Sequence, residues 1–273
     1  MSSGEEGQRS NSQFTGSAGD GADAGPPHLS VIVPAYNEEE RLPTTLDAIR
    51  QYLCRKPYTW EVIVVDDGSD DDTTRVAVEV AGESDWCHVV RQRHQGKAAA
   101  VRTGVDASVG ANVLFTDADL STPIDAVELL LAEREKGFDI AIGSREGTSA
   151  RRIDEPGYRH LMGRAFNWVV RLVAVRGIKD TQCGFKLLSR KAADRVFPKL
   201  LVNQSGVIVN GPRVSAFDVE LLFVAQREGY RIAEVPVVWT HARGSKVRPA
   251  LDSVRMFIDV LNVRWNALRG KYN

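Results

Sequence analysis

The feature that most constrains the fold is a repeated order of short apolar runs, polar loops and amphipathic segments in residues 28–144. The run "LSVIVPA" begins at Leu29 and is followed by apolar residues at helical spacing, Leu42, Leu46, Ile49 and Leu53. Short β-branched runs indicate buried strands, and apolar residues three or four positions apart indicate helices. Strands that alternate with helices favour right-handed crossovers, so the sequence predicts an α/β fold with a mainly parallel sheet flanked by helices.

The same plan recurs along the chain. "WEVIVVDDGSDDDTT" predicts a strand, a loop and a helix, and "CHVVRQ", "ANVLFTDAD" and "DIAIGSR" predict three further strands. In the less regular second half we expect a helix over 159–176, a loop in "KDTQCGFKLLSR", a helix in "FDVELLFVAQREG" and one strand in "IAEVPVVWT". Ligands of open parallel sheets bind beyond the carboxyl ends of the strands, where the polar clusters of this sequence lie.

Composition argues against several classes of protein. The formal net charge of −1 gives no support for a nucleic-acid binder. Three cysteines without a CxxC pair fit a reducing, cytoplasmic setting better than a disulfide framework. We see no run of about 18 apolar residues, so we expect no membrane-spanning helix.

Two carboxylates follow the apolar run "VLF" in the stretch "FTDADLSTP". Asp117 and Asp119 are two positions apart, and on an extended segment such residues point to the same side. Hard carboxylate oxygens suit Mg²⁺ or Mn²⁺, with phosphate oxygens in the remaining positions. The pair therefore indicates a metal-diphosphate site. The alternative is that Asp119 caps a helix near Pro123 and that Asp117 is only solvated.

Other polar residues at the predicted strand ends could bind a nucleotide. Asp66 and Asp67 are acceptors that could meet base N–H groups and ribose hydroxyls, and Tyr36 offers a face for stacking on a base. Lys97 and Arg102, at the opening of a predicted helix, could neutralise phosphates. The simpler interpretations are a turn with a helix cap and a pair of surface cations. Neither GxGxxG nor GxxxxGK[ST] is present, so a nucleotide would bind in another way.

Taken in order, seven motifs resemble the family 2 glycosyltransferases of the GT-A (Rossmann-like) fold: "VIVPAYNEEERL", "VIVVDDGSDDDT", "GKAAAVRTG", "DADLSTP", "GSR", "DTQCGFKL" and "FDVELL". The resemblance covers about residues 29–250 and is greatest to dolichyl- or polyprenyl-phosphate sugar synthases. It implies transfer of a sugar, with inversion, from a nucleotide-diphosphate donor to the phosphate of a polyisoprenoid lipid.

The resemblance also implies roles for individual residues. The nucleoside would be held by Pro34, Ala35, Tyr36, Glu38 and Asp67. Asp117 would contact donor and metal, and Asp119 would be the principal metal ligand. Arg145 would lie by the phosphates and Gln182 by the sugar or acceptor. Asp218 and Glu220 would lie near the reacting centre.

The residues after the carboxylate pair bear on the donor. Mannosyl-type members of the family carry "DADLQHP", whereas this chain has Ser121 and Thr122 after Leu120, which is closer to the glucosyl type. We therefore expect UDP-glucose as donor. GDP-mannose, a soluble hydroxyl acceptor, and a nucleotide-sugar-binding subunit without activity remain the alternatives.

The acceptor determines which groups the reaction needs. A hydroxyl acceptor needs a base such as Asp218 or Glu220. A phosphate monoester, with a second pKa near ~6, is already mostly dianionic, so cations that position it matter more. We expect Arg145, Arg159 and Lys246 to hold the lipid phosphate, and Asp218 to act as base or positioning group. His241, after a predicted strand, is either a further metal ligand or a surface residue.

Two segments, 159–176 and 246–273, mix bulky apolar residues with arginine and lysine. Basic amphipathic helices suit an anionic membrane surface, although such helices also pack on a core or on a partner subunit. We expect peripheral association with the cytoplasmic face of a membrane, with a homo-oligomer or a membrane-protein partner as further options.

The domain organisation follows from these assignments. We expect residues 1–27, rich in Gly, Ser and acidic residues, to form a disordered tail. One domain over 28–245 would comprise a nucleotide-binding half, 28–140, and an acceptor half, 141–245. Residues 246–273 would form a C-terminal basic amphipathic helix.

Overall fold

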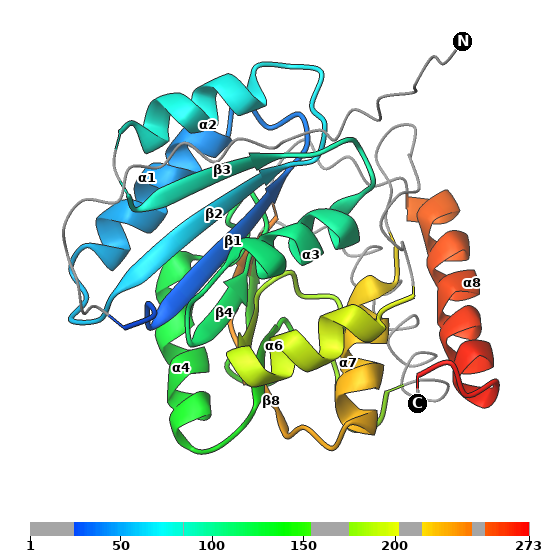
Figure 1. The fold of residues 1–273 in the computed structure, drawn as a ribbon. Coiled ribbons are helices and arrows are strands. Elements are labelled where there is room, and N and C mark those ends of the chain that lie inside the picture. The colour runs from blue at the N-terminus through cyan, green and yellow to red at the C-terminus, as the bar shows by residue number, and fades with distance from the viewer. Residues whose placement is uncertain (1–24, 84, 154–174, 202–214, 242–248, 273) are drawn as a thin grey trace, which may run out of the picture.

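The computed structural model describes residues 25–83, 85–153, 175–201, 215–241 and 249–272 (Figure 1). Its centre is a seven-stranded sheet of order β3-β2-β1-β4-β7-β5-β8. The strands are β1 (Leu29–Ala35), β2 (Trp60–Asp66), β3 (Cys87–Arg91), β4 (Asn112–Phe115), β5 (Ile140–Ser144), β7 (Lys186–Ser189) and β8 (Ile232–Pro236). Only β7 runs antiparallel to its neighbours, which confirms the prediction of a mainly parallel sheet.

The strand register brings three loops to one edge of the sheet. Ile32 of β1 pairs with Ile63 of β2 and with Phe115 of β4, so the carboxyl ends of these strands lie close together. The chain builds β1, β2 and β3 outward in one direction and then returns to place β4 on the other side of β1. This reversal of strand order is the position at which open α/β sheets bind ligands.

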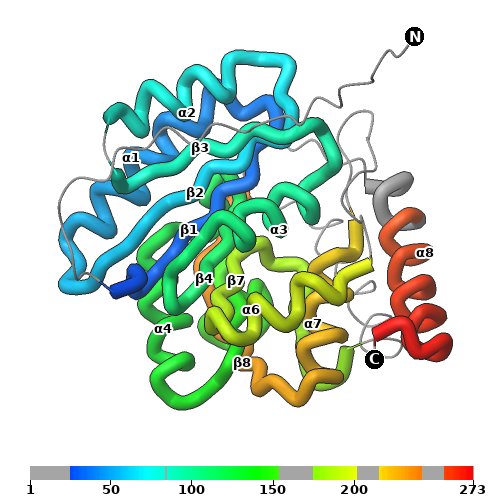
Figure 2. Tube along the Cα trace, viewed as in Figure 1, coloured from blue at the N-terminus to red at the C-terminus, as the bar shows by residue number. Residues whose placement is uncertain are grey.

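Helices cover both faces of the sheet, as predicted (Figures 1 and 2). One face carries α3 (Lys97–Ala107), α6 (Arg190–Val196) and α7 (Phe217–Arg227), and the other carries α1 (Leu42–Leu53), α2 (Thr73–Ala81) and α4 (Val127–Glu135). The single turns η1 (Ile124–Ala126) and η2 (Phe197–Lys199) precede α4 and follow α6. A separate apolar cluster lies on each face, so the sheet is buried on both sides.

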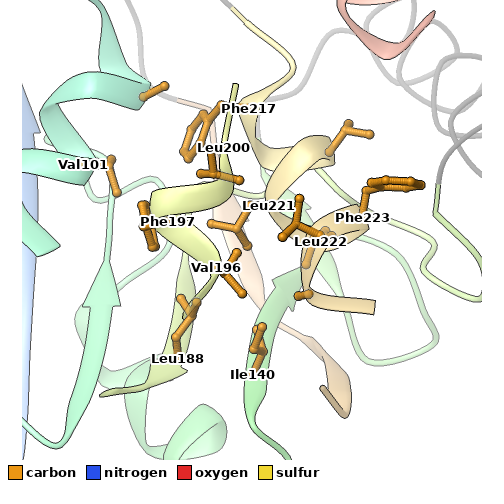
Figure 3. Packing of buried hydrophobic residues seen from close by; sticks show 14 of the residues in the cluster. Val101, Ile140, Leu188, Val196, Phe197, Leu200, Phe217, Leu221, Leu222 and Phe223 are labelled. Atoms are coloured by element: carbon orange, nitrogen blue, oxygen red, sulfur yellow. The ribbon is translucent and has the colours of Figure 1, made fainter. Parts of the chain in front are cut away.

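Figure 3 shows the cluster in which α6 and α7 pack on the sheet, with Phe197, Leu221 and Leu222 pointing toward Leu188 and Ile140. Nine of the eleven residues of α7 are buried, including two carboxylates. A buried carboxylate is costly unless it is paired. The partners of these two groups therefore decide what each can do.

Two local predictions were wrong. The segment "KDTQCGFKLLSR" was expected to be a loop, but Lys186–Ser189 form β7 between β4 and β5. A strand of four residues is too short for its periodicity to stand out. The expected single strand in "IAEVPVVWT" divides at Val237 into β8 and β9 (Val238–Thr240), and β9 pairs with β6 (Arg151–Ile153) in a second sheet.

The C-terminal helix α8 (Pro249–Leu268) stands beside α7 at the edge of the molecule (Figure 1). A helix was expected over 246–273, and the structure has it from Pro249 to Leu268. After the helix ends, Tyr272 is buried and its ring contacts Phe223. The expected helix over 159–176 lies almost wholly outside the described residues. Among the helices that are described, none has the length and apolarity to cross a membrane. The proposed domain boundaries remain a prediction.

Close packing of α3 on β1 gives a first test. A Cβ at Gly104 would overlap the Ile32 side chain. We expect Gly104→Ala to lower the free energy of unfolding by about 1–3 kcal/mol through overpacking, although alanine is the better helix former. Chemical denaturation measures the change. Gly25→Ala is the control, because a Cβ there meets no atom within 4 Å, and equal stability of both variants would contradict this packing.

Candidate active site

A cavity of about 230 Å³ opens at the carboxyl edge of β1, β2 and β4. Its walls come from the loops after these strands and from the start of α3. The lining residues are Pro34, Ala35, Tyr36, Glu38, Asp67, His94, Gly96, Lys97, Asp117, Ala118 and Asp119. The structure therefore gathers Lys97, the carboxylate pair and the residues that the family resemblance assigned to the nucleoside. Asp66 and Arg102, which the sequence also suggested for the nucleotide, do not line the cavity, and Asp66 instead accepts hydrogen bonds from Ser69.

Asp67 is the hydrogen-bonding centre of one wall. Its side chain accepts bonds from Gln92 Nε2 at 2.6 Å, from the Gln95 N–H at 2.9 Å and from the Gly96 N–H at 2.7 Å. His94 Nδ1 lies 2.8 Å from the same carboxylate. Asp67 is almost fully buried, so these bonds fix the loop 92–96 that leads into α3. The sequence assigned Asp67 to the nucleoside. Its hydrogen bonds to loop 92–96 were not expected.

Tyr36 forms an aromatic shelf with His94 at the cavity. The two rings stack with centroids 3.9 Å apart and planes 11° from parallel. His94 is a site residue that the sequence analysis missed. The available signal was its place two residues before Gly96, in the loop that opens the helix of Lys97.

Lys97 brings a positive charge from the first residue of α3 to the carboxylate pair. Its Nζ is ion-paired with Asp117 Oδ1. Desolvation lowers the pKa of this ammonium, but the carboxylates of Asp117, Asp218 and Asp119 outweigh that effect and raise its pKa above the ordinary value. Lys97 is therefore cationic at neutral pH, as a group that neutralises phosphate must be.

The carboxylate pair sits on a tight turn after β4. Asp119 Oδ1 accepts the Ser121 N–H at 2.9 Å, and Leu120 between them has a positive φ of 44°. The alternative in which Asp119 caps the following helix is wrong, because η1 has no side-chain cap. Gly184 packs against Asp117 so closely that a Cβ there would overlap the carboxylate. The absence of a side chain at Gly184, in the loop before β7, therefore makes room for the Asp117 carboxylate.

Asp218 lies near this group but is held by a cation from the core. Lys186 Nζ, fully buried, donates to Asp218 Oδ1 at 2.6 Å and also to the Cys183 carbonyl. Asp218 in turn contributes to the raised pKa of Lys97. Lys186 is the second site residue that the sequence analysis missed, since it was expected in a loop. The ion pair with Lys186 holds the Asp218 carboxylate in place, and its role as a base or as a positioning group remains a prediction.

Glu220 is engaged elsewhere. It is fully buried and accepts the Tyr272 hydroxyl at 2.5 Å and the Leu201 N–H at 2.8 Å. Burial, together with this carboxylate, raises the pKa of Tyr272, which therefore remains a donor. Glu220 does not line the cavity, so the structure does not bring it to Asp117 and Lys97 as the sequence suggested.

Arg145 follows β5 and forms a second rigid group, which does not line the cavity. Its Nε donates to Asp180 Oδ2 at 2.7 Å and its second guanidinium nitrogen to Oδ1 at 2.9 Å. Trp239 of β9 lies under the guanidinium at 5.4 Å. Burial alone raises the pKa of the Asp180 carboxyl, but Arg145 outweighs it and holds this pKa well below its usual range. Arg145 is therefore a preorganised cation rather than a mobile side chain.

The remaining predicted residues are spread more widely. The Gln182 N–H donates to Asp180 Oδ1 at 3.2 Å, and its amide Nε2 lies 3.8 Å from Met256 Sδ of α8. His241 follows β9, whose Thr240 N–H donates to the Ser121 carbonyl at 2.8 Å. Arg159 and Lys246 lie outside the described residues. In the described part of the chain no three His, Cys, Asp or Glu side chains form a metal-binding group, so His241 as a ligand remains a prediction.

Comparison with known proteins agrees with this geometry. Residues 30–197 match the family model described as glycosyl transferase family 2. The chain belongs to glycosyltransferase family 2. Its similar relatives include the dolichyl-phosphate beta-glucosyltransferases of Mus musculus, at 41% identity over 89% of this chain and 77% of the relative, and of Saccharomyces cerevisiae, at 35% over 89% and 76%. The family predicted from the motifs is confirmed.

Solved structures share the fold. Glucosyl-3-phosphoglycerate synthase from Mycobacterium tuberculosis, in complex with Mn²⁺, UDP and glucosyl-3-phosphoglycerate, aligns with a TM-score of 0.63 at 19% identity, covering 88% of this chain and 80% of that one. The same enzyme with Mg²⁺ and UDP aligns with a TM-score of 0.61 at 19% identity, with the same coverage. The predicted GT-A fold is confirmed, and the chain is a glycosyltransferase by family.

The Arg145–Asp180 pair gives a test with a pH dependence. We expect Asp180→Asn to cost about 3 kcal/mol of unfolding free energy at pH 7, at the lower end for a broken buried pair because Arg145 keeps 17% of its side chain exposed. The pKa of Asp180 is lowered by folding, so its contribution is complete above the unfolded-state pKa and is lost as pH falls through about 4 and below.

Urea unfolding of both proteins between pH 3 and pH 7 measures this difference. The gap between them should narrow toward low pH. The absence of a gap at pH 7 would show that the pair is unimportant for stability, and a gap that is constant with pH would contradict the lowered pKa of Asp180.

Proposed function

We propose that this protein transfers glucose, with inversion, from UDP-glucose to the phosphate of a dolichyl or polyprenyl lipid. The observation that carries the proposal is the group of Lys97, Asp117 and Asp119 at the cavity, in a chain similar to dolichyl-phosphate beta-glucosyltransferases over most of its length. Ser121 and Thr122, which follow the pair and favour the glucosyl type, are both buried.

The donor would lie across the switch point of the sheet. The base would stack on Tyr36, whose other partner is His94, and Glu38 would be placed to accept from the ribose. The diphosphate would lie by Lys97 at the N-terminus of α3, where the backbone N–H groups and the ammonium both favour an anion. In this arrangement Asp67 supports the base pocket from behind by ordering loop 92–96.

A divalent cation fits the residues present. Asp117 and Asp119 supply hard oxygen ligands, and the space that Gly184 leaves accommodates the Asp117 carboxylate. Two protein carboxylates with donor phosphate oxygens are a common ligand set for Mg²⁺, and Mn²⁺ accepts the same oxygens. When bound, such an ion neutralises the charge that develops on the leaving diphosphate.

The acceptor phosphate needs cations more than a base. Being mostly dianionic near neutral pH, it is already a nucleophile, so no proton has to be removed before attack. Arg145, held in place by Asp180 and Trp239, is suited to orient it. Arg159 and Lys246 are proposed as further ligands of the acceptor phosphate, and Gln182 as a residue that contacts the sugar or the acceptor. Asp218, ion-paired with Lys186, would position groups between donor and acceptor.

The lipid acceptor places the reaction at a membrane surface. We propose that the protein associates peripherally with the cytoplasmic face, where a nucleotide sugar is available, and that partners there include the anionic lipid surface. A membrane-protein partner or a second copy of the chain would be an additional contact, besides the lipid surface. No nucleic acid is expected as a partner.

A transfer assay tests the function. Purified protein is incubated with radiolabelled UDP-glucose, Mg²⁺ and dolichyl phosphate, and label is counted in the lipid extract. We expect lipid-linked glucose, at least tenfold more than with GDP-mannose, and loss of about a hundredfold or more in Asp119→Asn. Label in lipid only from GDP-mannose, label only on soluble hydroxyl acceptors, or donor binding without turnover would each contradict the proposal.

Gly184 allows a test of the metal clamp that leaves its ligands in place. In Gly184→Ala the new Cβ must displace the Asp117 carboxylate. We expect at least tenfold weaker binding of UDP in the presence of Mn²⁺, measured by calorimetry, with a smaller effect when Mn²⁺ is omitted. Gly143→Ala, in β5 and with its nearest contact at Cys183 Sγ, is the control. Equal UDP affinity with Mn²⁺ in both variants would contradict the clamp.

A further inference from the structure

Helix α8 carries two apolar rows, and the fold covers only one of them. The inner row, Met256, Val260, Val263 and Ala267, is buried. The outer row consists of Phe257, Ile258, Leu261, Trp265 and Leu268, with relative exposures between 41% and 69%. At 3.6 residues per turn the two rows point about 140° apart, so packing of α8 on α7 cannot cover both.

The outer row is a concentrated apolar surface. The described residues contain ten exposed large hydrophobic side chains, and five of them lie on this one face of α8. Others, such as Val78, Val109 and Leu129, lie on separate elements. Scattered apolar residues on a surface need no explanation, whereas a continuous ridge with a polar rim marks an interaction site.

The rim of this ridge is basic. Arg255, Arg264, Arg269 and Lys271 are exposed on or just after α8. Arg264 falls on one side of the ridge and Arg255 and Arg269 on the other, at about 100° per residue. Asp259, the only acidic residue in 255–272, is half-buried and accepts the Ala216 N–H at 3.2 Å. Within residues 255–272, every exposed side chain except that of Asn262 is therefore apolar or cationic.

We infer that the outer face of α8 docks on an anionic lipid bilayer and lies in the plane of its surface. The apolar ridge enters the interface, and the arginines and Lys271 contact the lipid phosphates. Charge complementarity favours this occupant over a second copy of the chain, because an isologous contact would bring like-charged rims together. The inference rests on the proposed function only in that a lipid acceptor gives the contact its purpose.

Three contacts join this surface to the site. The Tyr272 hydroxyl donates to Glu220 of α7, Asp259 accepts from Ala216 at the start of α7, and Met256 lies against Gln182. Helix α7 also carries Asp218. Docking of α8 therefore sets the orientation of the acceptor side of the cavity relative to the bilayer.

Vesicle binding tests the surface without donor or acceptor. The full chain is sedimented with vesicles of phosphatidylcholine alone or with 30 mol% phosphatidylserine. We expect at least tenfold tighter binding to the anionic vesicles, and a loss of about tenfold or more in Leu261→Asp/Trp265→Asp. The matched control is Leu129→Asp on α4, where the side chain is 52% exposed, and it should bind like the parent. Thermal unfolding confirms that each variant is folded.

The inference is overturned if the double variant binds anionic vesicles as tightly as the parent, or if the parent does not bind them. Light scattering provides a further check. If the parent protein is a dimer that does not bind vesicles, and the double variant is a monomer, the outer face of α8 binds a second copy of the chain and the inference is overturned. Its failure is separable from that of the proposed function. The double variant should still glucosylate a short polyprenyl phosphate in detergent, and should lose activity only when the acceptor is in vesicles.

Discussion

The buried carboxylate of Asp67 is the interaction on which the cavity wall between Tyr36 and Lys97 depends. It binds four donors from residues 92–96, and a carboxylate away from water is tolerated only when its lone pairs are satisfied. These bonds therefore hold loop 92–96 in a single conformation. That conformation places His94 against Tyr36 and starts α3 at Lys97, so a single side chain sets both the aromatic shelf and the cation beside the carboxylate pair.

Charges of opposite sign alternate from this cavity into the core. Asp117 pairs with Lys97, Asp218 acts on Lys97, and Asp218 pairs in turn with the buried Lys186. Each charge in this row therefore has a neighbour of opposite sign. The row crosses from β4 and α3 to α7 and β7, and it therefore connects the cavity to the core through electrostatics.

The sequence predicted the parts of the molecule that depend on local pattern. The strands around β1 and the carboxylate pair followed from apolar runs that end in polar clusters, whereas Pro34, Ala35 and Glu38 were assigned from the family resemblance. Glu220 was misplaced because Asp218 and Glu220 were treated as a pair, whereas residues two apart on a helix point about 200° apart. Its partner Tyr272 is 52 residues away, as is typical of contacts that no local pattern contains. Lys186 was missed because the short strand β7 was expected to be a loop, and His94 because its place near Gly96 was not used.

The turn that carries Asp117 and Asp119 has a consequence for how stability is distributed. Leu120 adopts a left-handed backbone conformation, which costs an ordinary residue roughly 1–2 kcal/mol. Surrounding contacts, including the Ser121 bonds to Asp119 and to Thr240, hold it there. Part of the folding free energy is thus spent on keeping two like charges side by side. Selection for thermal stability alone would relax this turn, and the protein would gain stability while the two carboxylates lost their fixed arrangement at the cavity.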